Sequence, residues 1–164
     1  MFRPMRRARQ QLSQEQAREI MERGRTGVLA LLGDQGYPYA LPINYVWHEG
    51  RIYFHCAREG HKLDAIAACP KVSLCVVDRD QVQPEKFTTL YRSAIAFGRA
   101  RRLEPGEEAL TAIRLLNRKY APGLEAQGEA AIEKSWAQLC LVEIQVEHLT
   151  GKQAKDLSSG GEGE

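Results

Sequence analysis

The stretch Tyr53–Ile66, YFHCAREGHKLDAI, is the most informative part of the chain because it passes from a strand through a turn into a helix. Aromatic residues lead to a strand end near Cys56, and Gly60 turns the chain. From His61 onward three apolar residues share one helical face, until Pro70 ends the helix. The stretch therefore predicts a strand, a tight turn and a short helix in direct succession.

The turn Gly60-His61-Lys62 has the features of an anion site. In the first turn of a helix the backbone N–H groups lack partners, and the helix dipole is positive there. Lys62 adds a charge-assisted donor, and His61 adds another when it is protonated. The alternative is a solvated surface lysine beside an ordinary histidine at a helix N-terminus. The spacing by itself leaves both interpretations open.

The segments before this stretch predict a helix and a series of strands. Ser13 and Gln16 have capping-box spacing, which indicates a helix from about Gln14 to Arg23. Strand patterns joined by short turns follow at 28–32, 37–47 and 51–56. Such short connections favour an antiparallel meander over parallel crossovers.

The segments after it predict more strands and a second longer helix. Lys71 to Asp78 alternates as a strand, 79–90 is expected to be a loop because it holds Pro84 and polar residues, and 91–103 is the next strand. A helix follows Pro105-Gly106, whereas 121–135 has no clear pattern. In the last strand, 138–149, even-numbered apolar residues are expected to point inward and Glu143 outward.

Composition limits the class of protein. With 164 residues, a net charge of +2 and a pI near 8.4, the chain has room for one ordinary domain. We expect a basic N-terminal arm at 1–12, one domain at 13–156 and a disordered tail at 157–164. No apolar run reaches the roughly 20 residues that span a bilayer. A cytoplasmic protein without membrane or nucleic-acid partners is expected.

Several common chemistries are absent from the sequence. The four cysteines form no CxxC pair and no Cys/His zinc spacing, so no metal site is predicted. There is also no GxSxG, HExxH, P-loop or GxGxxG motif. The cysteines are interpreted as small core residues.

A second candidate for ligand contact is the segment 36–45, GYPYALPINY, in which two prolines and an asparagine interrupt a strand. Proline removes a ladder donor, so this edge can leave backbone groups free for a flat polar ring such as isoalloxazine. Asn44 adds an adaptable donor and acceptor. The alternative is an edge strand blunted against aggregation.

His55 is the candidate catalytic residue. If Tyr53 and His55 share one face of their strand, with Phe54 and Cys56 on the other, the imidazole can act as a proton donor near neutral pH. The alternative is a structurally satisfied histidine.

Together these residues resemble the pyridoxamine 5'-phosphate oxidase-like FMN-binding split barrels, and among them the nitroimidazole-resistance proteins. The resemblance is carried, in this order along the chain, by the four stretches 36–45, 52–63, 91–100 and 149–152. It implies a mainly β fold with peripheral helices, built as a six-stranded antiparallel split β-barrel, and a homodimer with FMN at the subunit interface. The otherwise excessive aromatic residues Tyr45, Trp47 and Phe97 also favour a dimer.

The resemblance also implies the residues of the site. His61 and Lys62 occupy the places of an Arg-Lys pair that holds the FMN phosphate, and Ser93 matches a position contributed by the partner subunit. The full set of expected cofactor contacts is Tyr39, Leu41, Pro42, Ile43, Asn44, His55, Cys56, Gly60, His61, Lys62 and Ser93.

Two departures from the family pattern shape the expected function. Histidine in place of arginine at position 61 loses a permanent charge and a forked donor, so the phosphate clamp is weakened. The basic C-terminal end of the true oxidases has no counterpart, so oxidation of pyridoxine phosphate is not expected. We expect an FMN-dependent oxidoreductase acting on a small molecule, possible substrates being nitroaromatics and quinones.

One alternative is a flavin, F420 or haem carrier, for which His55, His61 and His148 are candidate axial ligands. A nucleic-acid-associated protein that uses the arginine-rich start is not expected.

Overall fold

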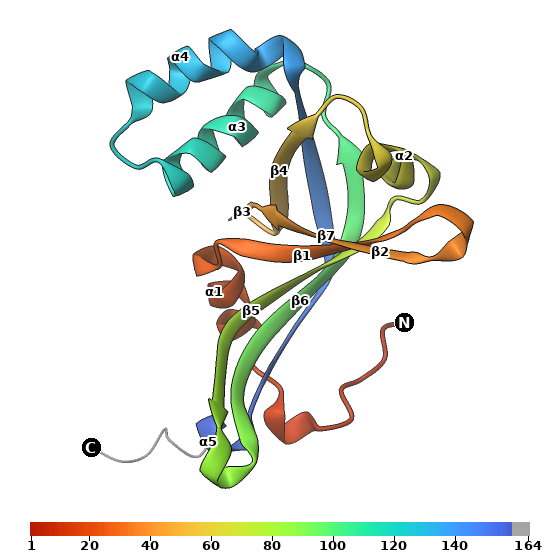
Figure 1. Cartoon of the computed structure of the whole chain (residues 1–164), viewed down its shortest axis with the longest axis vertical. Coiled ribbons are helices and arrows are strands. Elements are labelled where there is room, and N and C mark those ends of the chain that lie inside the picture. Colours follow the sequence, from red (N-terminus) through yellow and green to blue (C-terminus); the bar gives the residue numbers. More distant parts are fainter. Residues whose placement is uncertain (159–164) are drawn as a thin grey trace.

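The computed structural model describes residues 1–158, and its centre is one antiparallel sheet (Figure 1). Within these residues seven strands pair in the order β2-β1-β5-β6-β7-β4-β3. Their bounds are Thr26–Leu32 (β1), Pro38–Asn44 (β2), Val46–His48 (β3), Arg51–Ala57 (β4), Lys71–Gln83 (β5), Thr88–Arg102 (β6) and Leu139–Gln153 (β7). The predicted antiparallel, mainly β architecture with peripheral helices is confirmed.

The strand predicted at 37–47 is divided at Tyr45, so the six-stranded barrel is not confirmed. Its halves, β2 and β3, lie at opposite edges of the sheet, which is not a simple meander. The Tyr45 N–H donates to the hydroxyl of Tyr120 at 2.9 Å, and Lys119 Nζ donates to the Tyr45 carbonyl at 3.0 Å. Side chains of α3 thus satisfy the backbone groups that leave the ladder at the bend.

The prediction of a loop at 79–90 is wrong, because β5 and β6 continue through this segment as a long hairpin. Only a short 3-10 turn, Pro84–Lys86, joins the two strands. Pro84 begins this turn, where no ladder donor is needed, and so the strands are not interrupted. In Figure 1 the hairpin extends well below the body of the sheet.

Five α-helices occur in the described part of the chain: α1 (Gln14–Arg23), α2 (His61–Ala68), α3 (Glu107–Tyr120), α4 (Glu125–Ser135) and α5 (Lys155–Ser158). The capping box of α1 is present, with the Gln16 N–H donating to Ser13 Oγ at 3.1 Å. α4 buries only Ile132, which explains why its sequence lacks a helical period. None of these helices has the length and apolar character to cross a membrane.

The two ends of the chain differ from the expected boundaries in detail. Leu12, placed in the arm by sequence, is buried in the core, and Gln11 forms a bridge with Lys152 of β7. At the other end, the first two residues of the expected tail belong to α5. Residues 159–164 lie outside the described part of the chain.

Two cores lie on opposite faces of β4 and β7. One core packs α1 against the sheet and includes Phe54, and the other packs α3 and α4 against it and includes Tyr53. This confirms that neighbouring residues of β4 face opposite sides. It also corrects the prediction for Glu143, which is 3% exposed because the second core covers its face of β7. Its carboxylate accepts from Arg101 Nε at 2.9 Å and from the Tyr53 hydroxyl at 3.2 Å.

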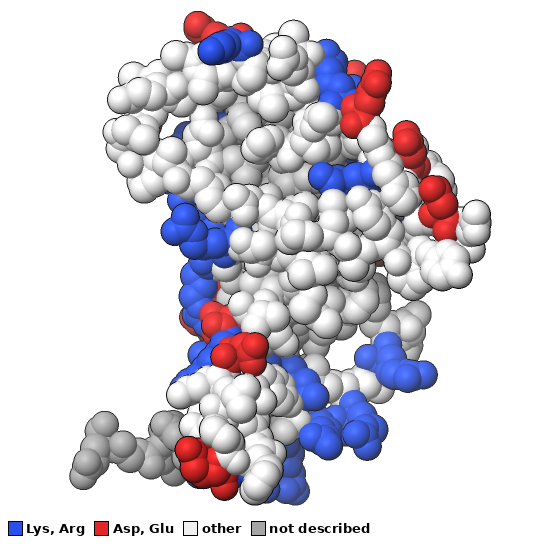
Figure 2. All heavy atoms as spheres, in the orientation of Figure 1, with Lys and Arg blue, Asp and Glu red and all other residues white. Residues whose placement is uncertain are grey.

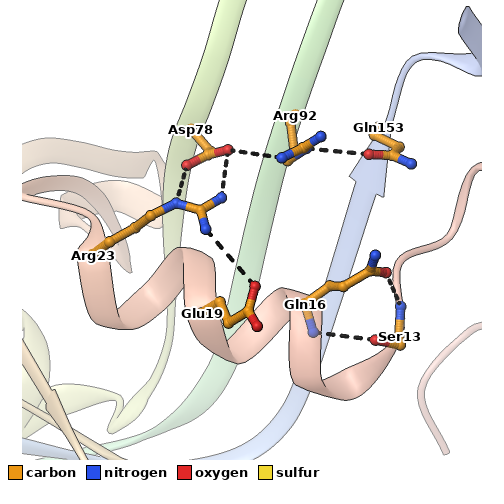
Figure 3. A network of polar contacts seen from close by, with 7 residues as sticks. All are labelled: Ser13, Gln16, Glu19, Arg23, Asp78, Arg92 and Gln153. Atoms are coloured by element: carbon orange, nitrogen blue, oxygen red, sulfur yellow. Dashed lines mark hydrogen bonds and ion pairs between the residues drawn. The ribbon is translucent and has the colours of Figure 1, made fainter. Parts of the chain in front are cut away.

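A polar network fastens α1 to the long strands (Figure 3). Arg23 of α1 donates to both carboxylate oxygens of Asp78, at 2.6 and 2.8 Å. Arg92 of β6 lies 3.8 Å from the same carboxylate and donates to Gln153 of β7 at 3.1 Å. Three elements therefore meet at one carboxylate, and Arg92 links them to β7. The hydrogen bonds from Arg23 hold the pKa of Asp78 below its usual value.

Replacing Asp78 with asparagine should lower the free energy of unfolding by about 1–2 kcal/mol at pH 7, because a two-point bond to a partly exposed arginine is lost. A lowered native pKa stabilises the fold above the unfolded pKa of about 4, and this contribution disappears as the pH falls through the native pKa. The difference between the variant and the unmodified protein should therefore shrink at pH 3.

Urea unfolding at pH 7 and pH 3 measures both effects. Glu147→Gln is the matched control, because Glu147 pairs with Arg99 at an exposed position and should contribute less than about 0.5 kcal/mol. An Asp78→Asn variant as stable as this control at pH 7 would contradict the role given to the network.

Candidate functional site

The turn between β4 and α2 has the geometry expected of an anion site. Gly60 has φ = 134°, a conformation that glycine adopts readily and that places its carbonyl to accept from the Leu63 N–H at 2.9 Å. No side chain caps α2. The N–H groups of His61 and Lys62 stand in the first helical turn, where the helix itself offers no acceptor.

His61 is held by contacts on both sides. Its ring stacks on Tyr39 of β2, with centroids 4.3 Å apart and planes 11° apart. Its Nε2 lies 3.6 Å from a carboxylate oxygen of Asp34, in the turn between β1 and β2. The imidazole is thus oriented at the mouth of the turn, and β2 is brought next to α2.

Lys62, unlike His61, has its neighbours on β4. Its Nζ is 5.6 Å from the centroid of the Phe54 ring. Among residues 1–158 no carboxylate forms an ion pair with it. An unpaired, half-buried ammonium beside an uncapped helix start favours an anionic ligand.

His55 and Cys56 lie within electrostatic range of Lys62. Solvent reaches the His55 ring, yet desolvation by surrounding protein atoms lowers its pKa, and the charge of Lys62 lowers it further. Burial raises the pKa of the Cys56 thiol to about 11. At neutral pH both side chains are therefore uncharged, and the neutral His55 ring offers one N–H hydrogen-bond donor and one acceptor nitrogen.

The expected contacts on β2 fall on two faces. Leu41 and Ile43 pack against the core, so they can offer a ligand only their backbone groups. Pro42 and Asn44 point to the other side of the strand and are exposed. β2 is an edge strand, and its outer backbone edge has no ladder partner in the described chain.

The outer face of the sheet, opposite α1, is broad and largely uncharged. Register places one row of residues across it: Ala40 and Pro42 of β2, Val28 and Ala30 of β1, Ser73, Cys75 and Val77 of β5, and Ser93, Ile95 and Phe97 of β6. Figure 2 shows a wide area without Lys, Arg, Asp or Glu around β1 and β2, with charged side chains toward the margins and the lower half. Val77, at 61% exposure, is one of its uncovered apolar side chains.

Ser93 lies on this outer face, far from Lys62 of the same chain. It pairs with Val77 of β5. Along β6, Ser93 lies seven residues before Ala100, and Ala100 lines the cavity beside α2. Seven residues of strand span about 23 Å. A single chain therefore does not bring Ser93 to the turn.

Of two cavities, one lies away from the turn and the other adjoins it. One, of about 710 Å³, lies between α1, β3 and β7 and includes Trp47 and His148. Phe2 of the N-terminal arm stacks on His148 with centroids 4.4 Å apart. The other, of about 500 Å³, lies along α2, adjoins the turn through Glu59 and Leu63, and includes Arg102. Neither includes His61 or Lys62, so this turn is an open corner of the single chain.

Sequence reasoning missed three residues at the corner. Asp34, Phe54 and Arg102 reach it from the β1–β2 turn, from β4 and from the end of β6. The sequence offers no signal for them, because strand register alone brings these segments together. The three histidines considered as haem ligands lie on β4, α2 and β7, each in a different environment.

The family model described as pyridoxamine 5'-phosphate oxidase matches residues 13–153, most of the chain. This chain belongs to the pyridoxamine 5'-phosphate oxidase family. The resemblance seen in the sequence is thereby confirmed. Among curated proteins no match is found.

Solved structures share this family's fold at low sequence identity. A conserved hypothetical protein from Mycobacterium tuberculosis has a TM-score of 0.81 and 18% identity, covering 98% of this chain and 97% of the other. A FAD and haem binding protein from Mycobacterium smegmatis has a TM-score of 0.76 and 21% identity, with coverage of 93% and 81%. A candidate 5-nitroimidazole antibiotic resistance protein from Bacteroides thetaiotaomicron has a TM-score of 0.71 and 17% identity, with coverage of 87% and 86%.

The corner of this pyridoxamine 5'-phosphate oxidase family member fits a phosphate group. Three independent features agree: an uncapped helix start, a glycine whose Cβ position is open space, and a lysine without a carboxylate partner. The stacked imidazole of His61 completes the rim.

Proposed function

We propose that this chain is a flavoprotein that binds FMN at the interface of a homodimer and acts as an oxidoreductase on a small molecule such as a nitroaromatic or a quinone. The observation that carries the proposal is the unpaired Lys62 beside the uncapped first turn of α2. A dianionic phosphate satisfies both features at once. Flavin-binding proteins among the similar structures support the choice of cofactor class.

Each part of the site has a task in this proposal. Lys62 and the first-turn amides of α2 hold the phosphate, and His61 closes its rim. The free backbone edge of β2 and Asn44 meet the polar edge of the isoalloxazine ring. FMN supplies the redox chemistry when it is bound, and the protein orients it. His55, neutral at pH 7, stands at the ring end of the site as a hydrogen-bond donor through its N–H.

The outer face and the position of Ser93 support the proposed homodimer. A largely uncharged sheet face with exposed apolar side chains is suited to isologous pairing. Pairing across this face would bring Ser93 of one protomer to the isoalloxazine ring bound by the other protomer. Within a single chain Ser93 does not reach the turn. It would also turn the open corner into an enclosed site from which water is excluded.

A spectrum of the purified protein tests the cofactor. We expect flavin absorbance, or its appearance on adding FMN, with a stoichiometry of one FMN per chain in a titration. Riboflavin, which lacks the phosphate, should bind more weakly by at least tenfold, since about 1.5 kcal/mol or more comes from charge-assisted bonds. If neither FMN nor riboflavin binds, the proposed function fails.

An enzyme and a flavin carrier share this binding site, and a kinetic measurement separates them. FMN bound to the protein is reduced anaerobically and mixed with a nitroaromatic or a quinone in a stopped-flow instrument. We expect oxidation of the bound flavin to be faster than that of free reduced FMN. An equal or slower rate would favour the carrier.

A further inference from the structure

Two cysteines face each other at the end of the β4–β7 ladder. Cys56 and Cys140 are directly opposite in the antiparallel register, and both pack against the same core as Phe54. Residues directly opposite in such a ladder have Cα atoms about 4.5–5.5 Å apart, which lies inside the range of about 4.4–6.8 Å found for disulfides. The backbone therefore already has the spacing of a cross-strand disulfide.

The other two cysteines have no such partner. Cys75 lies opposite Val28 and Ile95, on the outer face of the sheet. Cys69 is the residue that ends α2. Among the described cysteines only Cys56 and Cys140 occupy directly opposed positions in a ladder.

The surroundings give the two thiols different tasks. Cys56 is half-buried, and the cations Lys62 and Arg102 face it. Cys140 is 3% exposed. An external oxidant can thus reach Cys56, and the two cations favour the thiolate form that attacks, which partly offsets the effect of burial. Cys140 is shielded from solvent and stands where it can attack Cys56 in a second step.

We propose that Cys56 and Cys140 form a reversible dithiol–disulfide site, with a low-molecular-weight disulfide as oxidant. The Cys56 sulfur attacks the small disulfide, its S–S bond breaks, and one thiol leaves with the proton of Cys56. The Cys140 sulfur then attacks Cys56 and displaces the second thiol, which takes the proton of Cys140. In sum, two protein thiols and one small disulfide give one protein disulfide and two small thiols.

Cys56 is also an expected flavin contact, but the exchange itself needs no flavin. The new bond would join β4 to β7 immediately before the turn that leads into α2. Because burial raises the pKa of Cys56, the exchange is slow near neutral pH, which suits a site that reacts under oxidising conditions only. Oxidation of the cofactor-free protein and oxidation of the FMN-bound protein can therefore be followed separately.

The test uses the full chain without cofactor, incubated with excess oxidised glutathione, quenched in acid and examined by mass spectrometry. Basic residues such as Arg58, Lys71 and Lys134 separate the four cysteines into four tryptic peptides. We expect a protein lighter by two hydrogen atoms, with the peptides of Cys56 and Cys140 cross-linked and those of Cys69 and Cys75 free. Dithiothreitol should restore all four thiols.

Variants identify the order of attack. Cys140→Ala should stop at the first step and carry one glutathione on Cys56, whereas Cys56→Ala should give neither adduct nor cross-link. Cys75→Ala is the matched control and should form the same disulfide as the unmodified chain. Circular dichroism checks that each variant is folded.

The proposal is overturned if folded protein keeps four free thiols while a reference dithiol peptide is fully oxidised. A cross-link that includes Cys69 or Cys75 overturns it as well. The peptide map of the unmodified chain decides the question even if a variant does not fold.

Discussion

Replacing Lys62 with alanine should weaken FMN binding by about 1.5–3 kcal/mol, which is about 10- to 150-fold in Kd. The lysine has no ion pair to lose within the described chain, and its ammonium only approaches the face of Phe54. The folded protein should therefore be as stable as before, and the whole effect should appear in binding. Titration of FMN followed by flavin fluorescence measures it.

Ionic strength and two further variants sharpen this test. As the salt concentration rises, the affinity for FMN should fall more steeply in the unmodified protein than in Lys62→Ala, because the variant lacks one positive charge. Lys134→Ala, on α4 and away from the corner, should bind FMN as the unmodified chain does. His61→Arg should bind FMN more tightly, because a permanent charge and a forked donor replace the imidazole. A Kd unchanged in Lys62→Ala would place the phosphate elsewhere.

Replacing Val77 with lysine should abolish the homodimer and, with it, tight FMN binding. Val77 is 61% exposed in the single chain and lies opposite Ser93, so the substitution leaves the packing of the protomer unchanged. In a two-fold interface the introduced ammonium would be buried in an apolar surface, at a cost of several kcal/mol. Sedimentation velocity at micromolar concentration, with and without FMN, measures the mass of the particle.

Leu124→Lys is the matched control for this substitution. Leu124 is also an exposed apolar residue, at 48%, but it begins α4 on the far side of the second core. This variant should remain a dimer and bind FMN normally. A monomer of the unmodified protein that still binds FMN would remove the inter-subunit site from the proposal.

The local elements of the fold could be predicted from neighbouring residues. The capping box of Ser13 and Gln16 located α1, and Gly60 followed by His61 and Lys62 located the turn and the start of α2. These signals depend on hydrogen bonds and backbone preferences within a few residues, so they can be seen in a single sequence. The polar segment 79–90 was misassigned because a solvated hairpin lacks the apolar alternation that marks a strand.

Burial on β7 could not be predicted in the same way. Glu143 has the alternation of an outward residue, but α3 covers that face and Arg101 and Tyr53 bond to its carboxylate. The division at Tyr45 also depends on distant groups, because Lys119 and Tyr120 replace its ladder partners. In both cases the deciding partner lies more than forty residues away in the chain.

By itself the sequence determined the cation-bearing helix start at Lys62 and the antiparallel β character of the chain. The tertiary structure alone decided that Tyr39 stacks on His61, that Cys56 lies opposite Cys140, and that Ser93 stands on an outer face away from its own Lys62. The physical reason is the separation along the chain between the residues that interact. Helix starts and turns are set by contacts between neighbours, whereas strand register is set by which distant segments bury each other's apolar faces.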